Sequence, residues 1–227
     1  MLEKVPEHIA EVVVAAEKEG VVDDILLTTG TPESEDMGIE GLIRVIEAIR
    51  KVSEIPIGVQ FEPPVDRDTI RDVANAGATA VGMHIESADE EIREEMCPGK
   101  HQYGTLDLYQ RSWQYALDYF ERGNVSTFIL HGLGEDTTRT LNLVGELSEV
   151  GVMPIVAPVR PSQGSQLADF TPSYIGHLDE SVEFYKEVGK ILFQHGLNPK
   201  NTLAGCHRCG GCTPIQEAYD WAESVSS

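Results

Sequence analysis

Basic residues are scarce in this chain, and long hydrophobic runs are absent. Seventeen Lys and Arg stand against 38 Asp and Glu in 227 residues, which gives a formal net charge of −21. A surface this acidic repels phosphates and anionic headgroups, so we expect neither a nucleic acid nor a membrane as partner. No apolar run approaches the roughly 18 residues that a membrane span needs, and the N-terminus lacks the pattern of a secretory signal. We therefore expect a cytoplasmic protein with a small-molecule or carrier-bound substrate, although a plainly solvated acidic surface has the same composition.

Cysteine is also scarce, and three of the four cysteines are clustered near the C-terminus. Cys206, Cys209 and Cys212 are each separated by two residues, a pattern that indicates a metal or redox site rather than a disulfide framework. Thiolates suit zinc or iron–sulfur centres. Three closely spaced cysteines followed by proline favour a [4Fe–4S] cluster, whose fourth iron would bind Cys97, another group or substrate. The alternative is structural zinc, completed by His207, Cys97 or another histidine.

Five short apolar runs alternate with segments of helical periodicity. The runs are rich in Val and Ile and bounded by Gly, Pro or Asp, which is typical of buried parallel strands. They span residues 24–28, 56–61, 78–85, 125–130 and 153–159. Apolar residues at steps of three and four predict helices at 39–49, 109–120, 143–150 and 184–192. This alternation predicts a parallel sheet with right-handed crossovers.

The series opens on a predicted helix at 6–20, whereas a barrel normally opens on a strand. We therefore predict an α/β fold, a partial (β/α) barrel that lacks its first strand and covers residues 1–199. Residues 200–227 form the predicted C-terminal tail, which carries the Cys-x2-Cys-x2-Cys metal site.

Candidate ligand residues follow the predicted strands, where chemistry sits in α/β folds. Thr29, Gly30 and Thr31 are small and let a ligand approach the backbone, although a plain turn uses the same residues. Alternation along the third strand places His84 and Glu86 on one face, which favours a ligand role for both. Glu62, after the second strand, either points into a pocket or faces solvent.

Two further strand ends carry candidate residues. Gly132, Gly134 and Glu135 follow the fourth strand, where two glycines before a helix can admit a flat ring or an anion. Arg160 follows the fifth strand and suits a carboxylate, or else a structural ion pair.

Taken together, these strand ends resemble the radical SAM superfamily, and within it the biotin synthase and lipoyl synthase branch. The resemblance covers roughly residues 20–170. Residues 29–33 stand at the position of the family's Gly-Gly-Glu motif, and residues 84–117 resemble the segment that follows the family's fourth strand. Residues 128–136 resemble the glycine motif of the family's fifth strand, and Arg160-Pro161 resembles the Arg-Pro segment of its sixth. The resemblance implies that S-adenosyl-L-methionine (SAM) binds to Thr29, Gly30, Thr31, His84, Glu86, Gly132, Gly134, Glu135 and Arg160.

The family's Cys-x3-Cys-x2-Cys motif, which binds the SAM-cleaving cluster after the first strand, has no counterpart in this sequence. Three explanations are open: an N-terminally truncated sequence, a second chain that supplies the strand and motif, or a domain that has lost SAM chemistry. We expect the first. The resemblance then implies a full-length enzyme that abstracts hydrogen through a 5′-deoxyadenosyl radical. It also implies an auxiliary cluster at the tail that could donate sulfur. The 227-residue chain alone should not cleave SAM.

Two other functions compete with this hypothesis. One is an iron–sulfur or zinc accessory subunit without its own SAM cleavage, which an apolar groove beside the first helix would favour. The other is a barrel aldolase or isomerase with structural zinc. That function needs a catalytic Lys or an acid–base pair at the strand ends, and the sequence places no Lys directly there.

Overall fold

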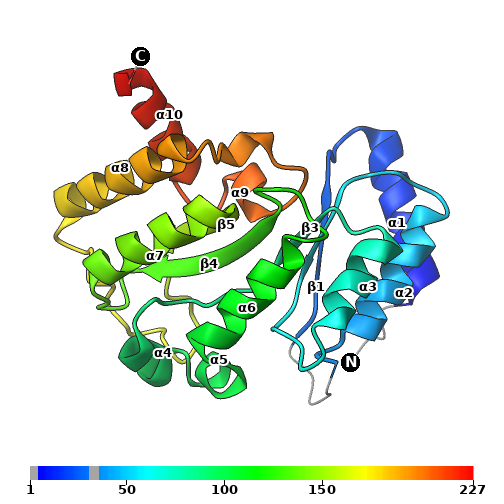
Figure 1. Cartoon of the computed structure of the whole chain (residues 1–227), viewed down its shortest axis with the longest axis horizontal. Helices are drawn as coiled ribbons and strands as arrows, with labels where there is room; N and C mark the ends of the chain where they lie inside the picture. The colour runs from blue at the N-terminus through cyan, green and yellow to red at the C-terminus, as the bar shows by residue number, and fades with distance from the viewer. Residues whose placement is uncertain (1–4, 31–35, 227) are drawn as a thin grey trace.

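The computed structural model describes residues 5–30 and 36–226, and its centre is one parallel sheet of five strands. The strands are β1 (Ile25–Thr28), β2 (Ile57–Gln60), β3 (Ala80–Gly82), β4 (Val125–His131) and β5 (Val152–Pro158). Each strand pairs in parallel with the next, in the order β1-β2-β3-β4-β5. The sheet is open, with β1 and β5 at its edges in the described part of the chain (Figure 1). The predicted α/β partial-barrel fold is confirmed.

Helices connect the strands and cover the sheet. They are α1 (Pro6–Glu19), α2 (Ile39–Arg50), α3 (Asp68–Ala76), α4 (Glu90–Met96), α5 (Pro98–Tyr103), α6 (Leu106–Ala116), α7 (Thr137–Val150), α8 (Leu178–Gln194), the 3-10 turn η1 (Pro199–Asn201), α9 (Cys206–Cys209) and α10 (Ile215–Ser226). Buried apolar side chains at helical spacing hold these helices to the sheet. None of the helices in residues 5–30 and 36–226 is both long and apolar enough to cross a bilayer.

The third strand is shorter than its apolar run predicts. β3 ends at Gly82, and Glu86 rejoins the sheet alone through a parallel bridge to Ile129. Glu86 has a φ of 68°, a left-handed conformation that costs a non-glycine residue energy and is common at functional sites. Strand alternation therefore does not run from His84 to Glu86, and the prediction that alternation places them on one face is wrong.

The cysteine-bearing tail packs directly on the sheet. Ala204 and Gly205 approach Gly58 of β2 so closely that a Cβ at Gly58 would lie 3.4 Å from the Ala204 Cβ. The Asn124 side chain accepts a hydrogen bond from Leu203 N at 2.8 Å, and Thr213 Oγ1 donates to Val156 O in β5. The tail thereby covers the face of the sheet that Gly58 presents.

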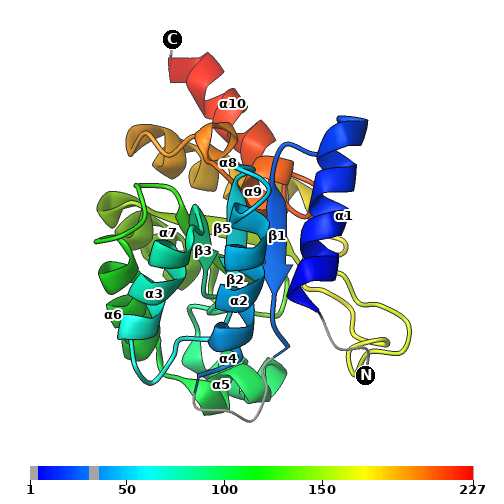
Figure 2. The ribbon, with the colours of Figure 1, turned by 90° about the vertical axis from the view of Figure 1, so that its right-hand side faces the viewer.

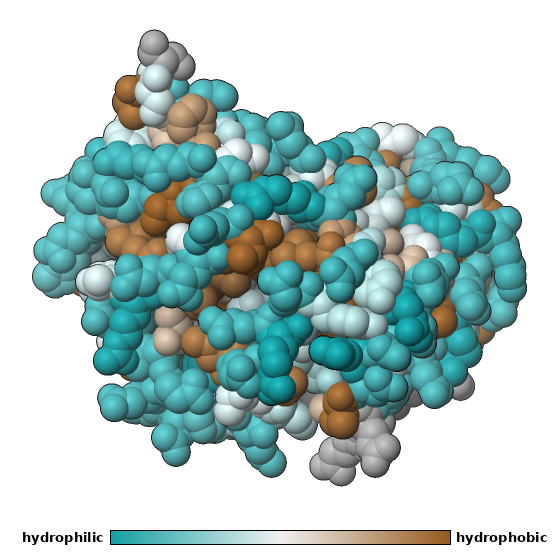
Figure 3. All heavy atoms as spheres, viewed as in Figure 1, coloured by the Kyte–Doolittle hydropathy of each residue, from teal (hydrophilic) through white to brown (hydrophobic). Residues whose placement is uncertain are grey.

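Hydrophilic side chains cover most of the face seen in Figure 3, and hydrophobic ones gather in a band between α6 and α7. A pocket of about 190 Å³ lies in this band, with Trp113 and Leu147 in its wall. Trp113 is otherwise buried, and its Nε1 donates to Met83 O at 3.0 Å. This contact anchors α6 beneath the end of β3.

Helices α8 and α10 meet at a glycine, and we expect Gly189→Ala to destabilise the fold. A Cβ at Gly189 would lie 2.1 Å from the carbonyl oxygen of Ala218, so α10 must shift. Overpacking of this kind lowers the free energy of unfolding by about 1–3 kcal/mol. Denaturant unfolding monitored by circular dichroism measures the change.

Gly145→Ala in α7 is the matched control, because a Cβ there meets no atom within 4 Å. The higher helix propensity of alanine should raise its stability by up to about 1 kcal/mol. Equal stability changes in the two variants would contradict the close α8–α10 contact.

Candidate functional site

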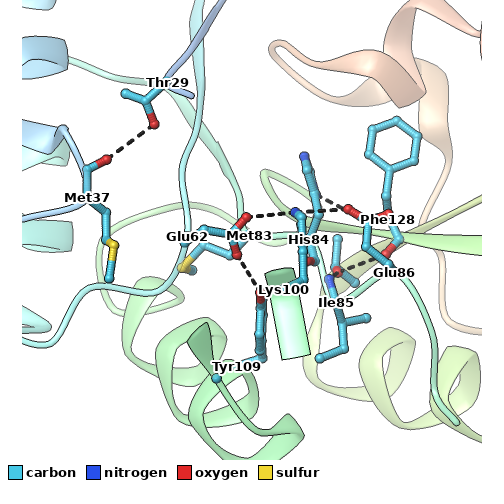
Figure 4. A network of polar contacts seen from close by, with 12 residues as sticks. Thr29, Met37, Glu62, Met83, His84, Ile85, Glu86, Lys100, Tyr109 and Phe128 are labelled. Carbon is cyan, nitrogen blue, oxygen red and sulfur yellow. Dashed lines mark hydrogen bonds and ion pairs between the residues drawn. The ribbon is translucent and has the colours of Figure 1, made fainter. Parts of the chain in front are cut away.

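A lysine lies between two glutamates at the carboxyl ends of β2 and β3 (Figure 4). The Lys100 ammonium, carried by α5, lies 2.8 Å from Glu62 Oε1 and 2.9 Å from Glu86 Oε1. It also donates to the His84 carbonyl oxygen at 3.2 Å. From α6, the Tyr109 hydroxyl donates to Glu62 Oε2 at 2.5 Å. Four separate elements thus converge on one polar site.

The charges of this site influence one another. Burial alone would lower the pKa of Lys100, but the carboxylates of Glu86 and Glu62 outweigh it and raise the pKa above its ordinary value. Burial and the Glu62 carboxylate together raise the pKa of Tyr109. Lys100 is therefore a firmly protonated ammonium and a poor nucleophile, which speaks against a Schiff-base aldolase.

The His84 ring faces away from this ion cluster and carries one unsatisfied nitrogen. Its Nδ1 accepts a hydrogen bond from Phe128 N at 3.1 Å, and the ring packs edge-on against the Phe128 ring at 4.8 Å. Burial, with smaller effects of Lys100 and His207, lowers the pKa of His84 to about 3. A neutral imidazole whose Nδ1 accepts must carry its proton on Nε2. This buried Nε2–H has no hydrogen-bond partner in the described part of the chain, so its donor is unsatisfied.

The loop after β4 is organised by Glu135. This carboxylate accepts hydrogen bonds from Gly132 N at 3.0 Å and Leu133 N at 2.8 Å, and lies 2.8 Å from His131 Nδ1. Burial would raise the pKa of Glu135, but these hydrogen bonds outweigh it and lower the pKa. Glu135 therefore shapes the loop, and its expected contact with SAM stays a prediction.

The two loop glycines differ in accessibility. Both have positive φ angles, 108° at Gly132 and 96° at Gly134. A Cβ at Gly132 would clash with the Tyr174 ring at 2.6 Å, whereas one at Gly134 would meet no atom within 4 Å. In this conformation, only Gly134 offers open space to a ligand.

The remaining predicted ligands lie at both edges of the sheet. Thr29 donates from Oγ1 to Met37 O at 3.3 Å, and Gly30 has open space around its Cα (Figure 4). Thr31 lies outside the described residues. Arg160 is exposed and donates to Gly211 O at 3.4 Å, so it contacts the cysteine tail.

The three tail thiols lie on and directly after the short helix α9. Burial and the neighbouring thiols of Cys212 and Cys209 raise the pKa of Cys206, which also receives a contact from Gln60 Nε2 at 3.8 Å. Cys206 is half-buried, whereas Cys209 and Cys212 are exposed. Within residues 5–30 and 36–226, no group of three or more His, Cys, Asp or Glu is already arranged to hold a metal ion. The donor chemistry fits a thiolate-bound centre, and the metal assignment stays a prediction.

Of the other two suggested ligands, Cys97 is poorly suited to the tail site, whereas His207 stays a prediction. Cys97 neighbours Glu86 and Lys100, and burial with the Glu86 charge raises its pKa to about 11. It is a thiol at neutral pH. His207 is fully buried, both of its ring nitrogens lack partners in the described chain, and burial lowers its pKa to about 4.

Sequence reasoning missed Lys100 and Tyr109 as members of the site. Both residues come well after β3 in the sequence. They lie on α5 and α6, and their side chains reach the strand ends from these helices rather than from strand-end loops. The available signal was Lys100 itself, which follows Glu86 and the acidic helix α4 in the sequence. Buried carboxylates need a partner cation, and Lys100 is the one that supplies it here.

Comparisons with known proteins agree with this geometry. The model of the Radical SAM superfamily matches residues 2–144. Among solved structures, an N-terminally truncated (1–46) Elp3 from the archaeon Methanocaldococcus infernus is similar, with a TM-score of 0.56 and 17% identity. The match covers 97% of this chain and 59% of that one, so the chain spans less than two thirds of that structure. No curated protein matches this chain.

Proposed function

Because this chain belongs to the radical SAM superfamily, we propose that it binds SAM at the carboxyl ends of β1 to β4. Members of this superfamily generally bind a [4Fe–4S] cluster and SAM. The observation that carries the proposal is the unpartnered Nε2–H of His84, a residue whose carbonyl oxygen accepts a hydrogen bond from Lys100 of the Glu62–Lys100–Glu86 site. Open backbone at Gly30 and Gly134 leaves room for a ligand on either side.

These residues would bind and orient the ligand. His84 donates its Nε2–H to an acceptor, while Glu86 offers a carboxylate held in place by Lys100. Gly30 and Gly134 allow contact with the backbone, and the strained backbone of Glu86 is fixed by hydrogen bonds to β4. Cleavage of SAM would need a reduced cluster to supply an electron. The sequence contains no Cys-x3-Cys-x2-Cys to hold such a cluster.

We further propose a relation to biotin and lipoyl synthases, with a small or carrier-bound substrate in the cytoplasm. Cys206, Cys209 and Cys212 would hold an auxiliary [4Fe–4S] cluster that donates sulfur. Support comes from the position of the tail, because Cys206 contacts Gln60 at the carboxyl end of β2. Arg160 links the end of β5 to the same tail. A sulfur source here would lie beside the SAM site.

Equilibrium dialysis with radiolabelled SAM tests the binding site. We expect His84→Phe, which keeps a ring but removes the donor, to weaken SAM binding about 10-fold, the value of one buried hydrogen bond. His8→Phe, on the exposed side of α1, is the control and should bind SAM as the wild type does.

Two outcomes would contradict parts of the proposal. One is equal SAM affinity in wild type and His84→Phe. The other is 5′-deoxyadenosine from the purified chain under reducing, anaerobic conditions, which would leave SAM binding intact but overturn the expectation that this sequence binds SAM without cleaving it.

An accessory subunit that pairs with a second chain is the alternative function. A groove of about 550 Å³ lies between α1 and α2, which pack side by side next to the edge strand β1 (Figure 2). Its apolar floor includes Ala10, Val14 and Val52. A partner that supplies a strand and the Cys-x3-Cys-x2-Cys motif would fit the edge of the sheet at β1. SAM cleavage that appears only when such a chain is added would support it.

A further inference from the structure

A serine, a histidine and a glutamate form a hydrogen-bonded series between β4 and α8. Ser181 Oγ lies 3.1 Å from His131 Nε2, and His131 Nδ1 lies 2.8 Å from Glu135 Oε1. These distances and this order of groups match a nucleophile, a general base and a carboxylate that orients the base. No part of the SAM-binding proposal uses Ser181.

The hydrogen bonds of Glu135 determine which way the protons point. Its carboxylate accepts from the backbone of Gly132 and Leu133, so it stays ionised and accepts the Nδ1–H of His131 as well. In the tautomer that donates Nδ1–H to Glu135, His131 Nε2 accepts the hydroxyl proton of Ser181. His131 is 5% exposed and its ring stacks on Phe184 at 4.3 Å, so the ring is rigidly held.

A pocket of about 320 Å³ gives access to this series. Both His131 and Ser181 line it, and its other walls are Thr137, Ser173, Tyr174, His177, Glu180 and Phe184. Helices α7 and α8 pack side by side and both begin at this pocket, with Thr137 and Leu178 as their first residues (Figure 1). The positive ends of two helices therefore face the place where negative charge would develop.

His131 and Ser181 lie apart from His84 of the proposed SAM site. His131 packs on Phe184 and Tyr185 of α8, whereas Phe128, three residues earlier in β4, packs on His84. Odd steps along a strand change its face, so the two histidines lie on opposite faces of the sheet.

We propose that Ser181, His131 and Glu135 form a second catalytic site, which hydrolyses small uncharged carboxylic esters. The aromatic walls Tyr174 and Phe184 suit an apolar acyl group. The carboxylate of Glu180 at the pocket rim and the net charge of −21 disfavour anionic substrates.

The reaction needs only the ester and water. Ser181 Oγ attacks the carbonyl carbon while its proton passes to His131 Nε2. The bond from carbon to the alcohol oxygen then breaks, and His131 returns the proton to the leaving alcohol. Water attacks the acyl-serine, its proton passes to His131 and then to Ser181 Oγ, and the carboxylic acid leaves.

A fluorophosphonate probe and p-nitrophenyl acetate test this proposal on the purified chain. The probe should modify wild-type Ser181 covalently, with loss of fluoride, as located by peptide mass spectrometry. Ser181→Ala should lose the label and slow p-nitrophenyl acetate hydrolysis at least about 100-fold.

Ser224→Ala is the control, because Ser224 is an exposed helical serine bonded only to a local carbonyl oxygen, and it should keep both signals. Circular dichroism confirms that each variant is folded. An unmodified Ser181 in the wild type, or hydrolysis by Ser181→Ala at the wild-type rate, would overturn the second site.

Discussion

Anaerobic reconstitution with ferrous iron and sulfide is expected to load one [4Fe–4S] cluster per chain, and Cys209→Ser is expected to abolish loading. Thiolates are the preferred ligands of iron–sulfur clusters, and a serine oxygen replaces one poorly. Removing one of three thiols leaves two, too few to retain a cluster. Mössbauer spectroscopy together with iron and zinc analysis measures the result.

The structure explains why one exposed thiol should matter so much. Cys206 and Cys209 begin and end the single turn of α9, and Cys212 follows after two glycines. Burial, together with the neighbouring thiols of Cys212 and Cys209, raises the pKa of Cys206. The positive φ of Gly210, 70°, lets the chain turn back toward α9. We therefore expect this glycine loop to rearrange when the three thiolates bind one centre.

Cys97→Ser provides a matched control for this experiment. Cys97 neighbours Glu86 and Lys100 rather than the tail, and its pKa of about 11 keeps it protonated. We expect Cys97→Ser to load a full cluster. Stoichiometric zinc without iron in the wild type would contradict the cluster assignment, and loss of the cluster in Cys97→Ser would make Cys97 its fourth ligand.

The strands could be predicted from sequence because local pattern alone determines them. Runs such as 125–130 are apolar, β-branched and bounded by turn residues, and each became a parallel strand. The periodic helices were found for the same reason. The end of β3 could not be predicted, since it depends on the left-handed conformation of Glu86 and its bridge to Ile129.

The site was only partly predictable because its contacts join distant segments. The sequence shows Glu62 and Glu86 at adjacent strand ends, but the ion pairs with Lys100 exist only once α5 folds over them. The same holds for Ser181, which meets His131 from a helix 50 residues later. Strand-end position indicates where chemistry gathers, whereas the partner of each group is set by tertiary packing.

Lys100→Met is expected to lower the free energy of unfolding by about 3–5 kcal/mol, the cost of removing one partner of a buried ion cluster. The Glu62 and Glu86 side chains are only 7% and 16% exposed, so water cannot replace the lost ammonium. Urea unfolding at neutral pH measures the loss. Lys190→Met is the control, because its pair with Glu187 is exposed and worth under about 1 kcal/mol.

The pH dependence gives a second, independent readout. The pKa of Lys100 is raised in the folded chain, so its stabilisation is fully present below the unfolded-state pKa and is lost as pH rises through the folded-state value, above 10.5. The stability gap between wild type and Lys100→Met should therefore stay constant up to about pH 10 and shrink above that. A gap that closes already between pH 6 and 8 would contradict this assignment.

A second substitution distinguishes the loss of a favourable ion pair from the cost of leaving a buried carboxylate without a partner. If the penalty in Lys100→Met comes from unpaired buried carboxylates, adding Glu62→Gln should recover part of the stability, because the amide removes one charge yet still accepts from Tyr109. In the wild-type background the same Glu62→Gln should destabilise, since it removes an ion pair with Lys100. Opposite signs of one substitution in the two backgrounds would identify Lys100 as the cation that holds both carboxylates at the strand ends. Equal effects would mean that the three groups do not act together.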